Sequence, residues 1–576
     1  MNWFKYVKPY LPFFIIGPLC MIVEVIGEVF MPKFLAAVIN NAADRAPLFS
    51  VGIALGMILT AILMMAGGIG GAYFGAKAAV SFAGDLRSDV YRKIQSYSFA
   101  NMERFSSASL VTRTTNDVVQ LQNFINMLLR MCLRAPGMMI GALIMAIRMS
   151  RSLSAVLSVS IPLLIVVILL LIRVSFPRFT RMQKKVDALN ARVQENVTNI
   201  RVVKSFVREE YERERFSEAN SDLKQSGLAA LRVMVFMSPI MTLVMNLTVI
   251  AVIAFGSGQV MNPNIDFEYG DLSAFITYVT QILSSLMMIT MMLMTSSRAL
   301  ASAKRIREVL TEEPEISDVN ASHPEKKIEQ GKIEFKNVAF RYYKNSPEKV
   351  LSDVNLTIPS GAVVGIIGST GCGKSTLVSL IDRLYDVDEG QVLIDDVDVR
   401  DYSIRNLRDG IGMVLQNNVL FSGTIRDNLL WGDQDASEEE MQSAAESAQA
   451  HKFVSSFANG YETVLGQGGS NVSGGQKQRL CIARALLKKP KILILDDSTS
   501  AVDTATEAEI RRAFRQELAD ATKIVIAQRI GSVKDADMIV VMNDGKITGV
   551  GTHDQLLAEN VEYLEIYRSQ TDRKEA

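Results

Sequence analysis

The feature that most constrains the fold of this 576-residue chain is a series of long apolar runs confined to roughly its first 300 residues. A helix that crosses a bilayer needs about 20 mainly apolar residues, and each run is near or above that length. The third and fourth runs are joined only by RMSRSLS, which is too short to hold a domain. We therefore predict six transmembrane helices, at roughly 14–40, 51–80, 125–150, 153–175, 229–256 and 273–299.

The N-terminal stretch MNWFKYVKPYLPFF shows no small-residue cleavage site after a short apolar core. We predict an interfacial amphipathic helix that leads into a retained span, and not a signal peptide. Residues 83–124 and 177–228 carry many charges beside a thin apolar stripe, so we expect long helices that project into water. Their lysines and arginines favour the cytoplasmic side. Six spans then place both termini in the cytosol, as in a multi-pass protein of the cytoplasmic (inner) membrane.

The overall composition excludes several classes of protein. The chain has 61 basic and 61 acidic residues, so no charge excess favours nucleic acid as a partner. Its four cysteines lie far apart, which argues against a disulfide framework or a zinc site and favours a reducing cytosolic side. Three histidines in the whole chain also argue against a multi-histidine metal centre.

The second half of the chain has a different pattern. After EEPEISDVNASHPEKKIEQG, a linker rich in Glu, Pro and Ser, short apolar strands alternate with helices. This alternation predicts a parallel sheet covered by helices. The expected organisation is an α-helical membrane domain with long cytoplasmic extensions at 1–311, a linker at 312–331 and an α/β phosphate-loop domain at 332–576.

The sequence GSTGCGKST follows an apolar strand and precedes a helical pattern, which is the context that a phosphate loop requires. A fortuitous glycine-rich turn is disfavoured because both the motif and its context match. The glycines let backbone amides turn toward phosphate oxygens, Lys374 can reach the β and γ phosphates, and Ser375 can bind Mg²⁺. The predicted binding residues are Gly368, Ser369, Thr370, Gly371, Cys372, Gly373, Lys374, Ser375 and Thr376.

A second strand, Ile492–Leu495, ends in the acidic pair Asp496–Asp497. Taken alone, this pair could simply cap the next helix. With a phosphate loop upstream, Asp496 is the expected Mg²⁺ partner.

A third motif, NVSGGQKQRLCIARAL, begins at Asn471. Ser473, Gly474 and Gly475 open a helix, so their free amides and the helix dipole predict a second anion site. A single nucleotide cannot easily use two such sites within one small domain. We therefore expect a head-to-tail pair of domains, in which each nucleotide lies between the phosphate loop of one and the SGGQ helix of the other.

These motifs, GSTGCGKST, VSGGQ, ILILDD and SAVD, in this order after six spans, make the chain resemble an ATP-binding cassette (ABC) exporter half-transporter over essentially its whole length. The resemblance implies ATP and Mg²⁺ as cofactors. It also implies that Ser473, Gly474, Gly475 and Gln476 contact the nucleotide bound to the partner chain. It also implies short coupling helices near 105–115 and 205–215 that dock on the cassettes.

The resemblance assigns further roles to single residues. Tyr342 would stack on adenine, Gln416 would sense Mg²⁺ and the membrane domain, and Ser500–Asp503 would form the D-loop. The alternatives are that Tyr342 is an ordinary strand aromatic and that Gln416 is an ordinary polar loop residue.

Two departures from the family pattern fall on the expected catalytic residues. Asp497 stands where the family has a catalytic glutamate, and Gln528 stands where it has a switch histidine. A carboxylate withdrawn by one C–C bond, about 1.5 Å, is poorly placed to orient the attacking water, and errors of about 1 Å can cost around 10²-fold. Gln467 also replaces a common acidic residue before the signature.

The binding residues and the signature are intact, so the chain resembles the degenerate-site member of a heterodimeric bacterial multidrug exporter. Its own site should hold ATP and hydrolyse it slowly, while its signature completes the competent site of a second half-transporter. We expect ATP-driven export of amphipathic small molecules, drugs or lipids. The alternatives are a regulatory nucleotide-gated subunit and a homodimeric lipid flippase.

The spans leave two interpretations of the substrate path open. They are rich in methionine, which suits variable apolar ligands but also ordinary packing among membrane lipids and helices. Glu24 and Glu28 lie four residues apart and so share a helix face in the first span. They predict either a cation-attracting site or a structural pairing with an arginine or amide on another span.

Overall fold

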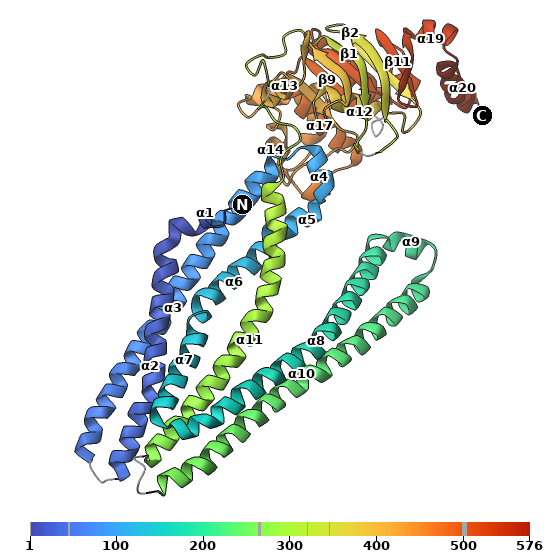
Figure 1. Cartoon of the computed structure of the whole chain (residues 1–576). Coiled ribbons are helices and arrows are strands. Elements are labelled where there is room, and N and C mark those ends of the chain that lie inside the picture. Colours follow the sequence, from blue (N-terminus) through green and yellow to red (C-terminus); the bar gives the residue numbers. More distant parts are fainter. Residues whose placement is uncertain are drawn as a thin grey trace. The chain divides into compact units, whose positions relative to one another are not determined.

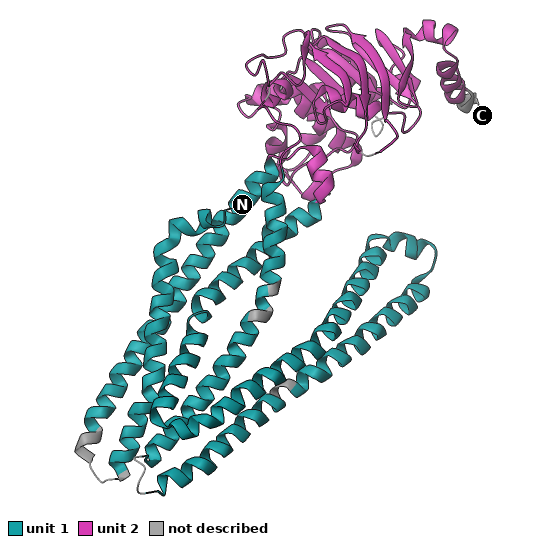
Figure 2. Cartoon of the chain, in the orientation of Figure 1, with its two compact units in different colours: residues 1–95, 107–312 teal, residues 96–106, 313–576 magenta. Residues whose placement is uncertain are grey.

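The computed structural model describes the backbone of residues 2–43, 47–262, 267–319, 321–344, 346–497 and 504–575. The chain forms two compact units (Figure 2). The first comprises Met1–Gln95 and Ser107–Glu312, and the second comprises Ser96–Ser106 and Glu313–Ala576. Residues 96–106 thus pack with the C-terminal unit although they precede residue 311 in the chain.

The first unit is entirely helical in its described part (Figure 1). Six helical stretches within the described residues are long and apolar enough to cross a membrane, as the sequence predicts. The helices are α1 (Phe4–Val7), η1 (Lys8–Tyr10), α2 (Leu11–Ala43), α3 (Pro47–Gln95), α5 (Ser107–Thr112), η2 (Arg113–Asp117), α6 (Val118–Met131), α7 (Arg134–Met149), α8 (Arg151–Thr198), α9 (Ile200–Ser205), α10 (Glu209–Val260) and α11 (Tyr269–Thr311).

Close helix packing in this unit follows from small residues and a shared apolar core. A Cβ added at Gly67 of α3 would lie 2.7 Å from the carbonyl oxygen of Cys20 on α2, so only glycine allows the two backbones to approach. Phe275 and Tyr278 of α11 are fully buried, and the Tyr278 hydroxyl donates to the Val29 carbonyl of α2 at 2.9 Å. The long helices α8 and α10 run side by side, with α9 between them in the chain (Figure 1).

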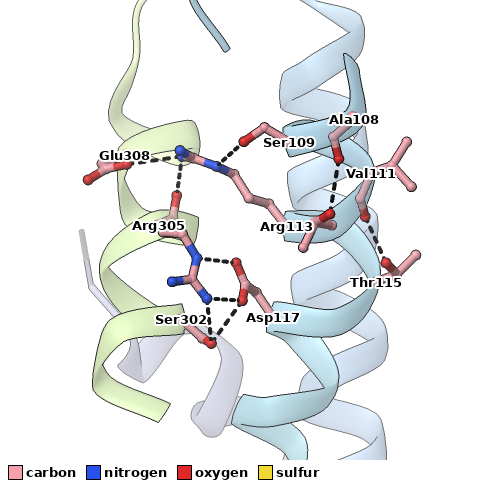
Figure 3. A network of polar contacts seen from close by, with 10 residues as sticks. Ala108, Ser109, Val111, Arg113, Thr115, Asp117, Ser302, Arg305 and Glu308 are labelled. Atoms are coloured by element: carbon pink, nitrogen blue, oxygen red, sulfur yellow. Dashed lines mark hydrogen bonds and ion pairs between the residues drawn. The ribbon is translucent and has the colours of Figure 1, made fainter. Parts of the chain in front are cut away.

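A polar network fastens α11 to the helix that starts at Ser107 (Figure 3). Its centre is Asp117, whose side chain is 3% exposed and lies at the end of the π-helical turn η2. Asp117 accepts from Arg305 Nε at 2.7 Å and from Ser302 Oγ at 2.9 Å. One turn away, Arg113 donates to the Arg305 carbonyl at 2.8 Å and pairs with Glu308 at 3.1 Å. The buried carboxylate is thus fully partnered.

The second unit contains a six-stranded and a four-stranded sheet among its described residues. The six-stranded sheet has the order β12-β11-β3-β10-β9-β6 and is parallel apart from β12. The four-stranded sheet, β2-β1-β4-β5, is antiparallel. The strands are β1 (Ile333–Phe340), β2 (Leu351–Ile358), β3 (Val363–Gly368), β4 (Glu389–Ile394), β5 (Val397–Asp398), β6 (Ile411–Val414), β7 (Gly423–Thr424), β8 (Val464–Leu465), β9 (Ile492–Asp496), β10 (Thr522–Ile526), β11 (Met538–Asn543) and β12 (Lys546–Gly551).

Helices accompany these strands in chain order, in the alternating pattern that the sequence predicts. They are α4 (Phe99–Phe105), α12 (Lys374–Ile381), α13 (Ile404–Asp409), α14 (Ile425–Leu429), α15 (Glu438–Ser447), α16 (His451–Val454), η3 (Gly460–Glu462), η4 (Gln467–Gly469), α17 (Gly474–Leu487), α18 (Thr504–Glu517), η5 (Ile530–Ser532), α19 (His553–Glu559) and α20 (Val561–Glu575). The central strands β9 and β10 are buried along their whole length, as expected for parallel strands covered on both faces.

Helix α4 is tied to the C-terminal unit by aromatic and polar contacts. The Tyr385 hydroxyl donates to Glu103 at 2.8 Å, and the rings of Phe99 and Tyr385 lie 6.2 Å apart. Asn101 donates to the Glu313 carbonyl at 3.1 Å and accepts from the Glu315 amide at 3.2 Å. Residues 96–106, which lie between two helices of the first unit in the chain, thus pack within the second unit.

Candidate functional site

The phosphate loop joins the end of β3 to the start of α12. Gly371 and Gly373 have φ values of +86° and +96°, conformations that glycine adopts without the cost of a Cβ. No described atom lies within 4 Å of a Cβ added at Gly371, so this part of the loop is open. At Gly368 an added Cβ would lie 2.1 Å from the Met542 carbonyl oxygen, which excludes any larger residue there.

Lys374 is folded over this loop. Its ammonium donates to the carbonyl oxygens of Gly368 at 2.9 Å and Ser369 at 2.7 Å. Cys372 is buried beneath the loop, with its sulfur 3.7 Å from the same ammonium. Lys374, the only cation among residues 368–376, therefore holds its ammonium against the loop backbone, where the phosphates of a nucleotide would bind. These residues fit such a ligand.

Ser375 and Asp496, the two predicted metal ligands, are already adjacent. The Ser375 hydroxyl donates to Asp496 Oδ1 at 3.1 Å. Ser375 follows the loop at the end of β3, and Asp496 is the last residue of β9. The two strands are parallel and separated only by β10, so their ends lie at the same edge of the sheet. Burial raises the pKa of Asp496, and the nearby charge of Asp497 raises it further. The hydrogen bond from Ser375 lowers this pKa and so opposes the rise. A hydroxyl and a carboxylate are oxygen ligands of the kind Mg²⁺ prefers, so the pair fits this ion.

Asp497 and Gln528 are hydrogen-bonded to each other. Gln528 Nε2 donates to Asp497 Oδ2 at 2.9 Å, and the Gln416 side chain also hydrogen-bonds the Asp497 carboxylate. Burial raises the pKa of Asp497, and these amides and the charge of Lys374 oppose the rise. The structure thus brings together three predicted site residues from the ends of β6, β9 and β10, with Gln416 beside Asp497.

Tyr342 follows β1 and packs against α12 and its neighbours. Its hydroxyl lies 2.9 Å from Thr376 Oγ1. Its ring meets Phe340 and Tyr385 edge-on, with centroids 5.0 and 5.1 Å away. The residue is 37% exposed, so part of the ring is left for a flat ligand.

The signature forms the start of α17, as the sequence predicts, but with one difference. Ser473 is the N-cap, and its hydroxyl accepts from the Gln476 amide at 3.3 Å while Gln476 Oε1 accepts from the Ser473 amide at 2.9 Å. This reciprocal capping box uses two amides within the motif. Gly474 and Gly475 therefore carry the amides left for an external anion, and no described atom lies within 4 Å of a Cβ added at Gly474.

Two further predicted features are the D-loop and the residue Gln467. The segment Ser500–Asp503 lies outside the described residues. Gln467 opens the short turn η4 ahead of the signature.

Glu24 and Glu28 pair with an arginine on another span, which is one of the two alternatives that the sequence leaves open, and the structure identifies this arginine as Arg134. Its NH2 group lies 3.1 Å from Glu24 and 3.4 Å from Glu28. An arginine within the third apolar stretch was the available signal, because a charge at that depth requires a partner.

Two family models match the two halves of the chain. One, described as ABC transporter transmembrane region, matches residues 14–286, and the other, described as ABC transporter, matches residues 351–500. An uncharacterized ABC transporter ATP-binding protein of Bacillus subtilis, YfiB, is 39% identical over 99% of this chain and 98% of its own length. The chain therefore belongs to the ABC transporter family.

Other similar proteins narrow the class. An ATP-dependent lipid A-core flippase of Syntrophus aciditrophicus is 33% identical over 98% of this chain and 93% of its own length. A fatty acid ABC transporter ATP-binding/permease protein of Mycobacterium bovis is 36% identical over 84% of this chain and 76% of its own length. A solved bacterial Atm1-family ABC exporter with ATP bound matches with a TM-score of 0.79 and 25% identity, covering 97% of this chain and 98% of that chain. This protein is an ATP-hydrolysing, multi-pass half-transporter with the exporter fold.

Proposed function

We propose that this chain is the degenerate-site half of a heterodimeric exporter of amphipathic small molecules, drugs or lipids. Its own phosphate loop and Tyr342 bind ATP, and Ser375, Asp496 and Gln416 bind Mg²⁺. Its intact signature, Ser473–Gln476, completes the competent site on the partner chain. Residues 1–311 serve as the membrane domain, 312–331 as the linker and 332–576 as the cassette, with both termini and the cassette in the cytoplasm.

The observation that carries this proposal is the hydrogen bond between Gln528 and Asp497, 2.9 Å long. An aspartate is shorter than a glutamate by one C–C bond, about 1.5 Å, and a displacement of this size can cost around 10²-fold in rate. Here the shortened carboxylate is also engaged by the amides of Gln528 and Gln416. An amide has no proton to exchange near neutral pH, so neither neighbour can replace a histidine. Slow hydrolysis at this site follows.

The residues that bind, in contrast to those that catalyse, are all retained. Lys374 donates to the loop carbonyls, Ser375 Oγ and Asp496 Oδ1 are 3.1 Å apart, and no described atom lies within 4 Å of a Cβ added at Gly474. A site that keeps binding groups while its water-activating groups are altered suits ATP retention. Open space at Gly474, in the signature, suits binding of a second nucleotide held by the partner chain.

The relatives' names bear on the substrate. A lipid A-core flippase and a fatty acid transporter are among the similar proteins, which supports an amphipathic lipid-like substrate. They also favour a second candidate function, a homodimeric lipid flippase. In that case both nucleotide sites of the dimer would carry Asp497 and Gln528, and turnover would be very low.

The test compares the purified full-length chain with the chain mixed with a half-transporter that carries a catalytic glutamate and a switch histidine. The natural source of such a partner is the neighbouring reading frame. We expect ATP hydrolysis barely above background from the isolated chain in lipid nanodiscs, and full turnover after mixing. Turnover by the isolated chain at the rate of the mixture would contradict the heterodimer.

Two variants test the division of labour within the mixture. Ser473→Arg places bulk and charge at the start of α17, so it should stop hydrolysis at the partner's site. Asp497→Asn should leave most turnover, since it changes a site that is already slow. Equal effects of the two variants would show that the roles have been assigned wrongly.

A further inference from the structure

A three-residue ion cluster lies between the first and third spans of the first unit. Arg134 of α7 pairs with Glu24 at 3.1 Å and with Glu28 at 3.4 Å, both on α2. The three side chains are 29%, 14% and 26% exposed, respectively, so the cluster is largely buried but not sealed from a ligand. With two carboxylates and one guanidinium, the cluster carries a net charge of −1. A purely structural pair would need only one of the two acids.

Unpartnered polar atoms gather around this cluster. Seven buried side-chain atoms lack a hydrogen-bond partner among the described residues, and four of them are Glu24 Oε2, Arg134 Nε, Gln281 Oε1 and Asn126 Oδ1. Buried polar atoms without partners are rare in folded proteins, and each asks for an explanation. Three of these four atoms are hydrogen-bond acceptors.

Contacts with α2 and α3 locate three of these atoms. Gln281 of α11 donates its amide nitrogen to the Glu28 carbonyl at 3.0 Å, which brings the other end of its amide beside α2. The carboxylate of Glu24 faces Gly68 of α3, where an added Cβ would lie 3.3 Å from Oε2. Asn126 Oδ1 faces Gly75 of the same helix, two turns or about 10 Å along it.

The surroundings of the cluster are apolar. Val25 and Val29 of α2 are buried beside Met138 and Ala142 of α7 in one hydrophobic core. A ligand here would therefore need an apolar body next to its polar group.

We propose that Glu24, Glu28, Arg134 and Gln281 form a binding subsite for a cationic, N–H-rich head group, an ammonium, amidinium or guanidinium, on an amphipathic molecule. The formal net negative charge attracts a cation and repels an anion, and the unpartnered acceptors Glu24 Oε2 and Gln281 Oε1 can take hydrogen bonds from an N–H-rich group. Glu24 Oε2 is the principal contact, because both Glu28 oxygens already lie within 3.5 Å of Arg134. The inference rests on the proposed export function and specifies its substrate class.

The test measures equilibrium binding of labelled octylguanidinium to the full-length protein in lipid nanodiscs, in the absence of ATP. Octyltrimethylammonium, a cation without N–H donors, and octanol, a neutral molecule of similar length, are the comparison probes. Octylguanidinium should bind at least about tenfold more tightly than octanol, with octyltrimethylammonium between them, because charge and hydrogen bonding both contribute. Equal affinities for the three probes would overturn the proposal.

Glu24→Gln should weaken octylguanidinium binding about tenfold, the usual scale for losing one charge-assisted contact. Glu28→Gln is the charge-matched control and should lose less. Wild-type affinity in Glu24→Gln, or an equal loss in both variants, would overturn the role of Glu24 Oε2. If Glu24→Gln does not fold, Glu24→Asp keeps the charge, withdraws the carboxylate by one bond and should show the same weakened binding.

The binding measurement does not involve the cassettes, so it separates this inference from the proposed function. Retained octylguanidinium binding in a mixture that cannot turn over ATP would count against the heterodimer alone. Normal turnover with no difference between the probes would count against the subsite alone.

Discussion

At the residue scale, the contact between Asp497 and Gln528 has two separable components, the reach of the acid and the chemistry of its neighbour. If the proposed roles hold, Asp497→Glu alone should raise hydrolysis only modestly, because Gln528 still occupies the position proposed for a switch histidine. Asp497→Glu combined with Gln528→His should raise phosphate release from the isolated chain by about tenfold or more, given the cost of a 1 Å displacement. Gln528→His alone is the control. A double variant no faster than wild type would show that the slow site has another cause.

A second residue-scale prediction concerns Asp382, at the end of α12. Burial raises the pKa of Asp382 to about 6 from its ordinary 3.8, although the charges of Arg408 and Lys488 oppose the shift. The folded state therefore binds a proton more tightly than the unfolded state. Its stability is highest below pH 4 with respect to this group, and it falls as pH rises from about 4 to 6. Two pKa units correspond to about 3 kcal/mol at pH 7.

Asp382→Asn removes this cost, so it should raise the Tm of the cassette at pH 7 and leave it nearly unchanged at pH 4. Thermal unfolding across pH 4–8 measures the difference from wild type. Asp409→Asn is the control, since the Asp409 side chain is 66% exposed. A gain of the same size at both ends of the pH range would contradict the titration of Asp382.

At the scale of elements, the network around Asp117 links the π-helical turn η2 to α11 (Figure 3). Both η2 and the C-terminal end of α11 lie near points where the chain passes from one unit to the other, after residue 106 and before residue 313. In the second unit, the segment 96–106 is joined to the segment that begins at residue 313, because Asn101 hydrogen-bonds the backbones of Glu313 and Glu315. The two chain crossings are therefore fastened together within each unit. π-helical turns are frequent at functional sites, which makes this one a candidate for mutation.

Asp117→Asn should lower the Tm of the membrane unit clearly, because it breaks a buried, charge-assisted pair. Removing one partner of a fully buried pair costs about 3–5 kcal/mol, and we expect about 2 kcal/mol here because Arg305 is 45% exposed and can be solvated. Glu308→Gln is the matched control on the same network. The Glu308 side chain is 44% exposed, so its loss should cost about 1 kcal/mol or less. Equal losses would show that Asp117 is not the centre of the network.

At the scale of the whole molecule, the proposed slow site has a role only if the nucleotide it holds affects the proposed partner chain. Each sandwiched ATP would bridge both chains, so a retained ATP would bias the equilibrium felt at the other site. Lys374→Ala should therefore lower nucleotide occupancy at this chain's loop and also reduce turnover at the partner's intact site. The measurement is nucleotide retained after rapid washing, alongside phosphate release by the mixture. Equal retention and equal turnover in the variant and wild type would identify this site as a relic.

Local patterns in the sequence were sufficient for the six spans, the phosphate loop and the helix that Ser473 opens. Each of these depends on residues close together in the chain: an apolar run of bilayer length, glycines between a strand and a helix, or a serine and two glycines that open a helix. The resemblance to ABC exporters also predicted that Asp497 stands at the position of a catalytic glutamate and Gln528 at that of a switch histidine. The family comparisons and the fold confirm the class of protein that these patterns predict.

Only the tertiary structure decided which distant groups meet. Gln528 reaches Asp497 because β9 and β10 are neighbours in register, with Ile526 opposite Asp496. Arg134 reaches Glu24 and Glu28 because α7 packs on α2, over 100 residues away in the chain. Residues 96–106 join the second unit because Glu103 and Asn101 find their partners there. Helical and strand periods specify which face a residue occupies, whereas the partner on the opposing face is selected by packing between elements remote in sequence.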